Sequence, residues 1–120
     1  MEPHVDSVRF GTITVAGQTF KHDIVITLDG EVRKREKRLS KQLYGTSHTV
    51  SQAEIETVWE KGAEALIVGT GLFDRVRLSP EAQFFLAQQG CAIESRRIRQ
   101  AVRLWNDSRG KVVGLFHITC

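Results

Sequence analysis

The segment VGLFHITC brings together an imidazole and a thiol, at His117 and Cys120, with Thr119 between them. An imidazole beside a thiol can lower the pKa of the thiol and so create a nucleophile. In a regular strand, however, side chains alternate between the two faces, so His117 and Thr119 share one face and Cys120 lies on the other. The spacing argues against a thiolate–imidazole pair or a metal clamp. We expect His117 to be hydrogen-bonded in a polar pocket and Cys120 to pack as a small apolar residue.

The stretch LIVGTG, residues 66–71, is a second candidate, because an apolar run ends there at two glycines. Phosphate-binding loops of this kind lead directly into a helix, whose free amide groups face the phosphate. Here Gly71 is followed by Leu-Phe-Asp and a strand-like RVRL, without the Walker lysine or the third glycine of the dinucleotide motif. We therefore predict a tight corner with positive φ at one or both glycines, and no nucleotide site.

This corner can still form one wall of a pocket, because ligands of open α/β sheets favour the carboxyl ends of strands. Its exposed backbone amides would then meet a small anion or a metabolite. No catalytic residue is assigned, since the carboxylates show no paired arrangement, and Asp23 is the acid expected to be buried. The candidate ligand pocket consists of Gly69, Thr70, Gly71, His117 and Thr119.

Four apolar residues form a candidate interaction surface: Leu72, Phe73, Phe84 and Phe85. Phe84 and Phe85 are adjacent on a predicted helix, so one ring faces the core and the other points elsewhere. An exposed ring beside the corner residues would make an apolar patch of the kind that marks interfaces. The alternative is that neighbouring layers bury both rings.

Composition places the chain among ordinary globular proteins. It has 120 residues, of which 41% are hydrophobic and 26% charged, enough for one domain over residues 1–120. No apolar run is long enough to span a membrane, and the first residues lack a signal-peptide pattern. We expect a soluble cytoplasmic protein without a membrane partner. Two cysteines make neither a disulfide framework nor a zinc site, so no metal or cofactor is expected.

The net charge of +3 is concentrated in two segments, RKREKRLSK (residues 33–41) and RRIRQAVR (residues 96–103). Basic clusters can bind nucleic acid. They are more often solvated surface, and Glu31 and Glu36 dilute the first. Weak nucleic-acid binding therefore ranks last among the hypotheses.

The first part of the chain reads as strands. Residues 8–17 alternate like one strand with a bulge at Gly11, a turn follows, and a second strand over residues 20–27 has Ile24 to Ile26 as its buried core. Asp29-Gly30 forms a hairpin corner, and residues 31–36 continue as a charged edge strand. Residues 37–49 lose all periodicity, and we predict a loop there.

The remainder alternates strands with helices. Ser51 and Glu54 predict a reciprocal capping box at the start of a helix that ends at Gly62, and Ser79 caps a second helix that ends at Gly90. A third helix covers residues 97–109. Strands are expected at residues 64–69, 75–78, 91–95 and 111–120. This order predicts an α/β domain with a mixed sheet covered by helices. Asp74 is expected to stabilise the corner, and Asn106 to bond with backbone.

Several segments together resemble a known family: LIVGTG after a capped helix, QAVRLWN, the terminal VGLFHITC, and FGTITVAGQTFKHDIVI with Phe20 and Asp23. This small-domain family of largely unknown function includes an adipogenesis-associated vertebrate protein and a mitochondrial complex I assembly factor. The resemblance implies a three-layer α/β domain with N-terminal hairpin strands, a mixed sheet and about three helices, without established catalysis or cofactor. The chain departs from the family at Ile98, where a helix-capping Thr is usual, and in its charged 32–40 loop, where a Trp is frequent.

Three hypotheses follow, in this order. The first is a non-enzymatic protein-interaction or assembly module, motivated by the assembly-factor relative and by the missing catalytic constellation; kinship alone does not fix function. The second is a small-ligand binder or enzyme that uses the pocket near Gly69–Gly71 and His117. The third is the weak nucleic-acid binder described above.

Overall fold

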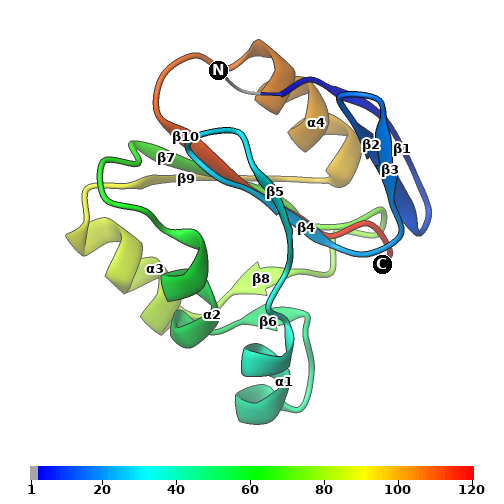
Figure 1. The fold of residues 1–120 in the computed structure, drawn as a ribbon. Helices are drawn as coiled ribbons and strands as arrows, with labels where there is room; N and C mark the ends of the chain where they lie inside the picture. The colour runs from blue at the N-terminus through cyan, green and yellow to red at the C-terminus, as the bar shows by residue number, and fades with distance from the viewer. Residues whose placement is uncertain (1–2) are drawn as a thin grey trace.

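The computed structural model describes residues 3–120 and is built around a five-stranded mixed sheet with strand order β5-β4-β10-β7-β9 (Figure 1). Strands β7, β9 and β10 are parallel, whereas β4 runs antiparallel to β10 and β5 antiparallel to β4. The bounds are Ile24–Ile26 for β4, Val32–Lys34 for β5, Ala65–Gly69 for β7, Ala92–Arg96 for β9 and Val112–Phe116 for β10.

Both faces of this sheet are buried, because alternate residues of its strands enter two separate cores. Ile67 packs into one core, whereas its neighbours Leu66 and Val68 pack into the other. The first core is covered by α4 and by a three-stranded antiparallel sheet, and the second by α2 and α3 (Figure 1). These elements are β1 (Val5–Arg9), β2 (Thr12–Val15), β3 (Gln18–Phe20), α2 (Gln52–Val58), α3 (Pro80–Gln88) and α4 (Ile98–Asp107). The predicted α/β class with a mixed sheet is confirmed.

The described residues contain four helices where about three were expected, because residues 37–49 are not a simple loop. They contain α1 (Arg38–Tyr44) and the first residue of β6 (Thr49–Val50), which pairs in parallel with β8 (Arg77–Leu78). Within α1 only Ser40 is buried, so the helix has no apolar stripe for the sequence to show. Of the helices over residues 3–120, none is long and apolar enough to cross a membrane.

Several predicted boundaries were wrong. The last strand, expected over residues 111–120, ends at Phe116. Gly11 is not a bulge inside one strand but part of the turn that joins β1 to β2. The strand predicted over residues 20–27 is broken into β3 and β4. Helix α2 ends at Val58, because Trp59 is already extended, and Gly62 lies in a later turn.

The corner after β7 needs its two glycines for different reasons. Gly71 has φ of 101°, as predicted, and a Cβ there would lie 2.5 Å from the carbonyl carbon of Cys120. Gly69 has no positive φ; a Cβ there would lie 2.7 Å from Cδ1 of Ile98, at the start of α4. Gly71 therefore makes the turn, and Gly69 lets α4 approach the sheet.

Candidate functional site

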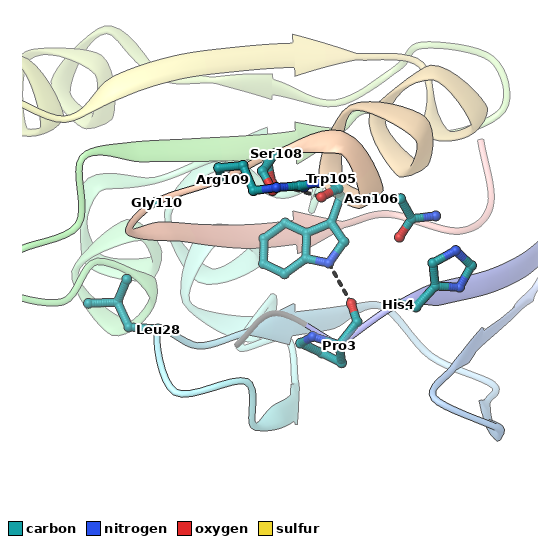
Figure 2. A pocket seen from close by; sticks show the side chains of 8 residues that line it. All are labelled: Pro3, His4, Leu28, Trp105, Asn106, Ser108, Arg109 and Gly110. Atoms are coloured by element: carbon teal, nitrogen blue, oxygen red, sulfur yellow. Dashed lines mark hydrogen bonds between the residues drawn. The ribbon is translucent and has the colours of Figure 1, made fainter.

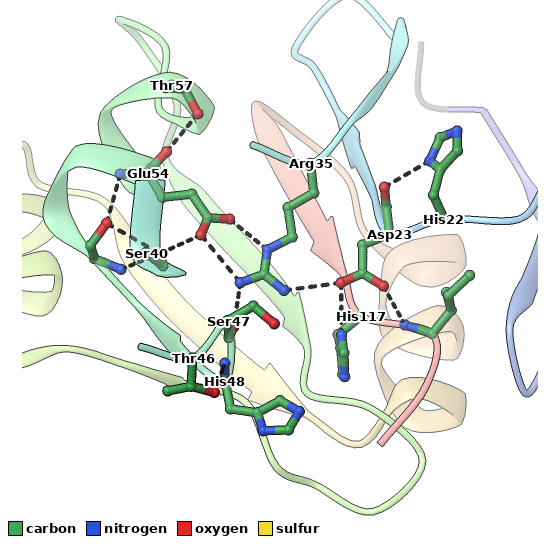
Figure 3. Close-up of polar contacts among 12 residues, drawn as sticks. His22, Asp23, Arg35, Ser40, Thr46, Ser47, His48, Glu54, Thr57 and His117 are labelled. Carbon is green, nitrogen blue, oxygen red and sulfur yellow. Dashed lines mark hydrogen bonds and ion pairs between the residues drawn. The ribbon is translucent and has the colours of Figure 1, made fainter. Parts of the chain in front are cut away.

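A buried guanidinium joins two carboxylates, one next to the start of β4 and one on α2 (Figure 3). Arg35 is 3% exposed and lies between Glu54, which is fully buried, and Asp23. Its Nε and Nη2 donate to the two carboxylate oxygens of Glu54, at 2.6 and 3.2 Å, and its Nη1 donates to Oδ2 of Asp23 at 2.9 Å. Nη2 also donates to the backbone oxygen of Ser47 at 2.6 Å. A fork of this kind holds carboxylates in fixed geometry.

Local structure explains why these charges meet. The hairpin of β4 and β5 pairs Ile24 with Lys34, and the next position places Asp23 opposite Arg35, whose amide donates to the Asp23 carbonyl at 3.1 Å. Asp23 is buried, as expected, whereas the role of Arg35 was not predicted and Glu54 was expected to cap a helix. The sequence signal that could have revealed this contact is the pairing across the predicted hairpin, which places Arg35 opposite Asp23.

Only one of the two hydrogen bonds of the predicted capping box between Ser51 and Glu54 forms. The Ser51 hydroxyl accepts from the Glu54 amide, as predicted, at 3.1 Å. The Glu54 carboxylate does not return the bond, because it is engaged by Arg35 and by the Ser40 hydroxyl. Ser40 takes the role predicted for the Glu54 carboxylate, because the Ser40 hydroxyl oxygen accepts from the Ser51 amide at 2.9 Å. Helix α1 therefore completes both the cap of α2 and the buried charge network.

Asp23 links this network to His117. Nδ1 of His117 lies 2.7 Å from Oδ2 of Asp23, and the Ile118 amide donates to Oδ1 at 3.0 Å. Burial alone would raise the pKa of Asp23. Its pKa is nevertheless held below the usual value by the hydrogen bond and charge of His117, by the Ile118 amide and by Arg35. Asp23 is therefore an ionised acceptor for all three donors.

The depressed pKa of Asp23 makes stability pH-dependent. The stabilisation is present above the carboxyl's unfolded pKa of about 3.9 and is lost as the pH falls through the lower folded value. We expect the free energy of unfolding, measured by urea denaturation from about pH 6 down to about pH 3, to decrease at the acid end. Asp23→Asn should be less stable at neutral pH and should flatten that decrease. An unchanged acid slope in Asp23→Asn would contradict the assignment.

The structure brings together part of the predicted ligand pocket. A Cβ on Gly71 would lie 2.7 Å from Cδ2 of His117, and Oγ1 of Thr119 lies 3.2 Å from Nε2 of His117. Thr70 faces elsewhere, and its hydroxyl donates to Asp74 and to the Arg96 carbonyl.

Several backbone amides at and just after the corner have partners. That of Thr70 donates to the Arg96 carbonyl at 2.8 Å. Those of Leu72, Phe73 and Arg75 donate to the backbone oxygens of Thr119 and Cys120, at 2.8 to 3.3 Å. The corner therefore holds the segment after β10 in place. A small-ligand pocket here stays a prediction.

The candidate interaction surface is divided. Leu72 packs against the core under α4, whereas Phe85 packs against the core on the opposite face and contacts Trp59 edge to face. Phe73 and Phe84 are exposed, at 63% and 66%. Phe73 has a partner that the sequence did not suggest: its ring centroid lies 6.5 Å from that of Phe10, which is 60% exposed.

The basic segments are paired in part, because four of their ten arginines and lysines have a carboxylate partner. Arg35 is buried, and Arg33, Arg38 and Arg96 lie within 4 Å of Glu31, Glu36 and Glu94 respectively. The pairing weakens the electrostatic footprint that nucleic-acid binding requires.

A cavity of about 380 Å³ lies at the opposite end of β10 from His117 (Figure 2). Its lining includes Pro3, His4, Trp105, Asn106 and Arg109. The Trp105 indole donates to the Pro3 carbonyl at 2.8 Å, and the Asn106 amide bonds both backbone groups of Val5. Asn106 is thus the structural clip that the sequence predicted, and its bonds tie β1 to α4.

The chain belongs to the family described as a protein of unknown function (DUF498/DUF598), whose model matches residues 5–117. It is similar to the conserved hypothetical protein PH1505 from Pyrococcus horikoshii OT3, at 30% identity and a TM-score of 0.91 over 97% of this chain and 98% of that one. A structure titled MT938 is 27% identical, with a TM-score of 0.85 over 99% and 100% of the two chains.

A more distant match shows the fold alone. A Bordetella pertussis protein described as an Mth938-like domain is 21% identical, with a TM-score of 0.66 over 97% of this chain and 85% of that one. These matches support a small α/β family of unknown function. The adipogenesis-associated and assembly-factor relatives remain a resemblance.

Proposed function

We propose that the chain is a protein-interaction module of the assembly type, which binds a partner protein through the aromatic surface formed by Phe10 and Phe73. The observation that carries the proposal is the contact between these two exposed rings, which come from segments far apart in the sequence. Large exposed aromatic side chains are favoured at the centres of interfaces.

The backbone behind this surface is fixed. The amide of Gly11, next to Phe10, donates to the Ile118 carbonyl at 2.8 Å, and the Phe73 amide donates to the Cys120 oxygen at 3.1 Å. Both rings are therefore attached to the same segment after β10. A surface ordered before binding loses less conformational entropy when a partner docks.

Charge next to the rings defines the chemistry of the partner. Exposed Arg9 precedes Phe10, and exposed Arg75 follows Phe73 by two residues. The carboxylate of Asp74, between Phe73 and Arg75, is already engaged by Thr70 and Arg77. The chain as a whole carries +3. The complementary partner is a protein with an apolar patch surrounded by acidic residues.

The test is co-purification of the N-terminally tagged protein at near-physiological salt, followed by affinity measurements with the purified partner. We expect Phe73→Asp to weaken binding about 30-fold or more, the loss typical of an interface hot spot. Phe84→Asp is the matched control, because Phe84 is equally exposed but lies on α3. It should bind like the wild type.

Two results would overturn the proposal. One is the absence of any stoichiometric partner. The other is a partner whose affinity changes equally in Phe73→Asp and Phe84→Asp, since the effect would then not belong to this surface.

A further inference from the structure

Asp23, His117 and Thr119 form a continuous chain of hydrogen bonds from the buried network toward the surface. Oδ2 of Asp23 lies 2.7 Å from Nδ1 of His117, and Nε2 of the same ring lies 3.2 Å from Oγ1 of Thr119. Asp23 and His117 are buried, at 7% and 5% exposure, whereas Thr119 is partly exposed. The order is carboxylate, imidazole, hydroxyl, with the hydroxyl toward solvent.

The proton positions follow from the partners. An ionised Asp23 carboxylate only accepts, so Nδ1 of His117 carries a proton in both the charged and the neutral ring, and the neutral ring is the form that leaves Nε2 unprotonated. Nε2 then presents a lone pair to the Thr119 hydroxyl, which donates to it. This is the arrangement in which an imidazole serves as a general base for a hydroxyl nucleophile.

The surrounding structure holds the three groups in register. The His117 amide donates to the Gly69 carbonyl at 2.9 Å, and the Ile118 amide fixes Oδ1 of Asp23. Gly71 lies against the His117 ring, where a side chain would collide with it. Arg35 anchors the Asp23 carboxylate from the other side, as Figure 3 shows. Such support from neighbouring groups is what a reactive constellation requires.

We infer that Thr119 is a nucleophile for activated acyl donors, with His117 as its base and Asp23 as the positioning residue. Oγ1 of Thr119 attacks the acyl carbonyl carbon while its proton moves to Nε2 of His117. The bond from the acyl carbon to the leaving oxygen breaks, and that oxygen takes the proton. Water then cleaves the Thr119 ester, which releases the carboxylic acid and restores the hydroxyl. The inference goes beyond the protein-interaction role and does not depend on it.

The charges around the site favour the negative charge that develops during attack. His48 lies edge to face with His117, with ring centroids 5.5 Å apart. Burial lowers the pKa of His48, and the positive charges of Arg75 and Arg35 lower it further, whereas Asp23 raises it. The exposed guanidinium of Arg75 is the positive charge available to an acyl oxyanion formed at Thr119.

The test uses p-nitrophenyl acetate with the full chain carrying Cys120→Ser, which removes a competing thiol. The other cysteine, Cys91, is buried, and burial raises its pKa. We expect one acetyl group on Thr119 by peptide mass spectrometry, with release of p-nitrophenolate. Thr119→Val in the same background should slow that release about 100-fold, the usual contribution of a base-activated group. Thr119→Ser should retain it.

Several results would overturn the assignment of Thr119 as a nucleophile. Acetylation confined to lysines, or equal p-nitrophenolate release from the protein with Thr119 and with Thr119→Val, would end the proposal. If Thr119→Val did not fold, Thr119→Ser would decide, because it keeps the hydroxyl: no acetyl group at that position would also end it. His117→Gln keeps Thr119 but should lose the acetyl label, because the base is gone. This variant therefore separates base catalysis from mere exposure of the Thr119 hydroxyl. None of these results bears on the Phe73 surface.

Discussion

Arg35→Met is expected to lower the free energy of unfolding by about 3–5 kcal/mol, the cost of removing one partner from a buried ion pair. The substitution keeps an unbranched chain of similar length but leaves Glu54 and Asp23 without their guanidinium. Glu54 is fully buried, and its carboxylate would keep the Ser40 hydroxyl as its donor. Urea denaturation at neutral pH measures the loss.

Arg33→Met is the matched control, because Arg33 lies two residues earlier on the same hairpin with its side chain 47% exposed. Its effect should stay within about 0.5 kcal/mol. Adding Glu54→Gln to Arg35→Met should recover part of the lost stability, since the isosteric amide carries no charge to leave unpaired. If Arg35→Met were as stable as Arg33→Met, the buried pairs would contribute nothing to folding.

The sequence predicted those elements whose burial leaves a regular pattern. Strand β7 was visible as an unbroken apolar run because both of its faces are covered, and α4 because Ile98, Ala101, Val102 and Trp105 form one buried face. Helix α1 was missed for the converse reason. Its only buried residue is a serine, so no periodic burial marks it.

The site was predicted in part. The predicted last strand ends at Phe116, before His117 and Thr119, but the two side chains do lie on one side as expected and form a hydrogen bond. Arg35 was missed because it stands in a run of basic residues, and arginine is almost never fully buried. The Phe10–Phe73 contact depends on how two distant turns meet, which no local pattern encodes. Contacts between remote segments need the folded backbone, whereas contacts across a hairpin can be read from its register.

Gly71→Ala is expected to lower the free energy of unfolding by about 4 kcal/mol, because two costs add. An alanine held at φ of 101° is strained by about 1–3 kcal/mol, and forcing a methyl into a filled space costs about as much again. The new Cβ would lie 2.5 Å from the Cys120 carbonyl carbon and 2.7 Å from the His117 ring. Backbone atoms cannot move aside as a flexible side chain can, so the whole segment after β10 would have to shift.

Gly90→Ala separates the two costs. Gly90 also has positive φ, 68°, but a Cβ there would meet nothing within 4 Å. Its loss, measured by the same urea denaturation, should therefore be about 1–2 kcal/mol, from backbone strain alone. Equal losses in the two variants would mean that the corner does not pack against the segment after β10. A loss in Gly71→Ala well above that of Gly90→Ala would show that this contact holds His117 and Thr119 in place.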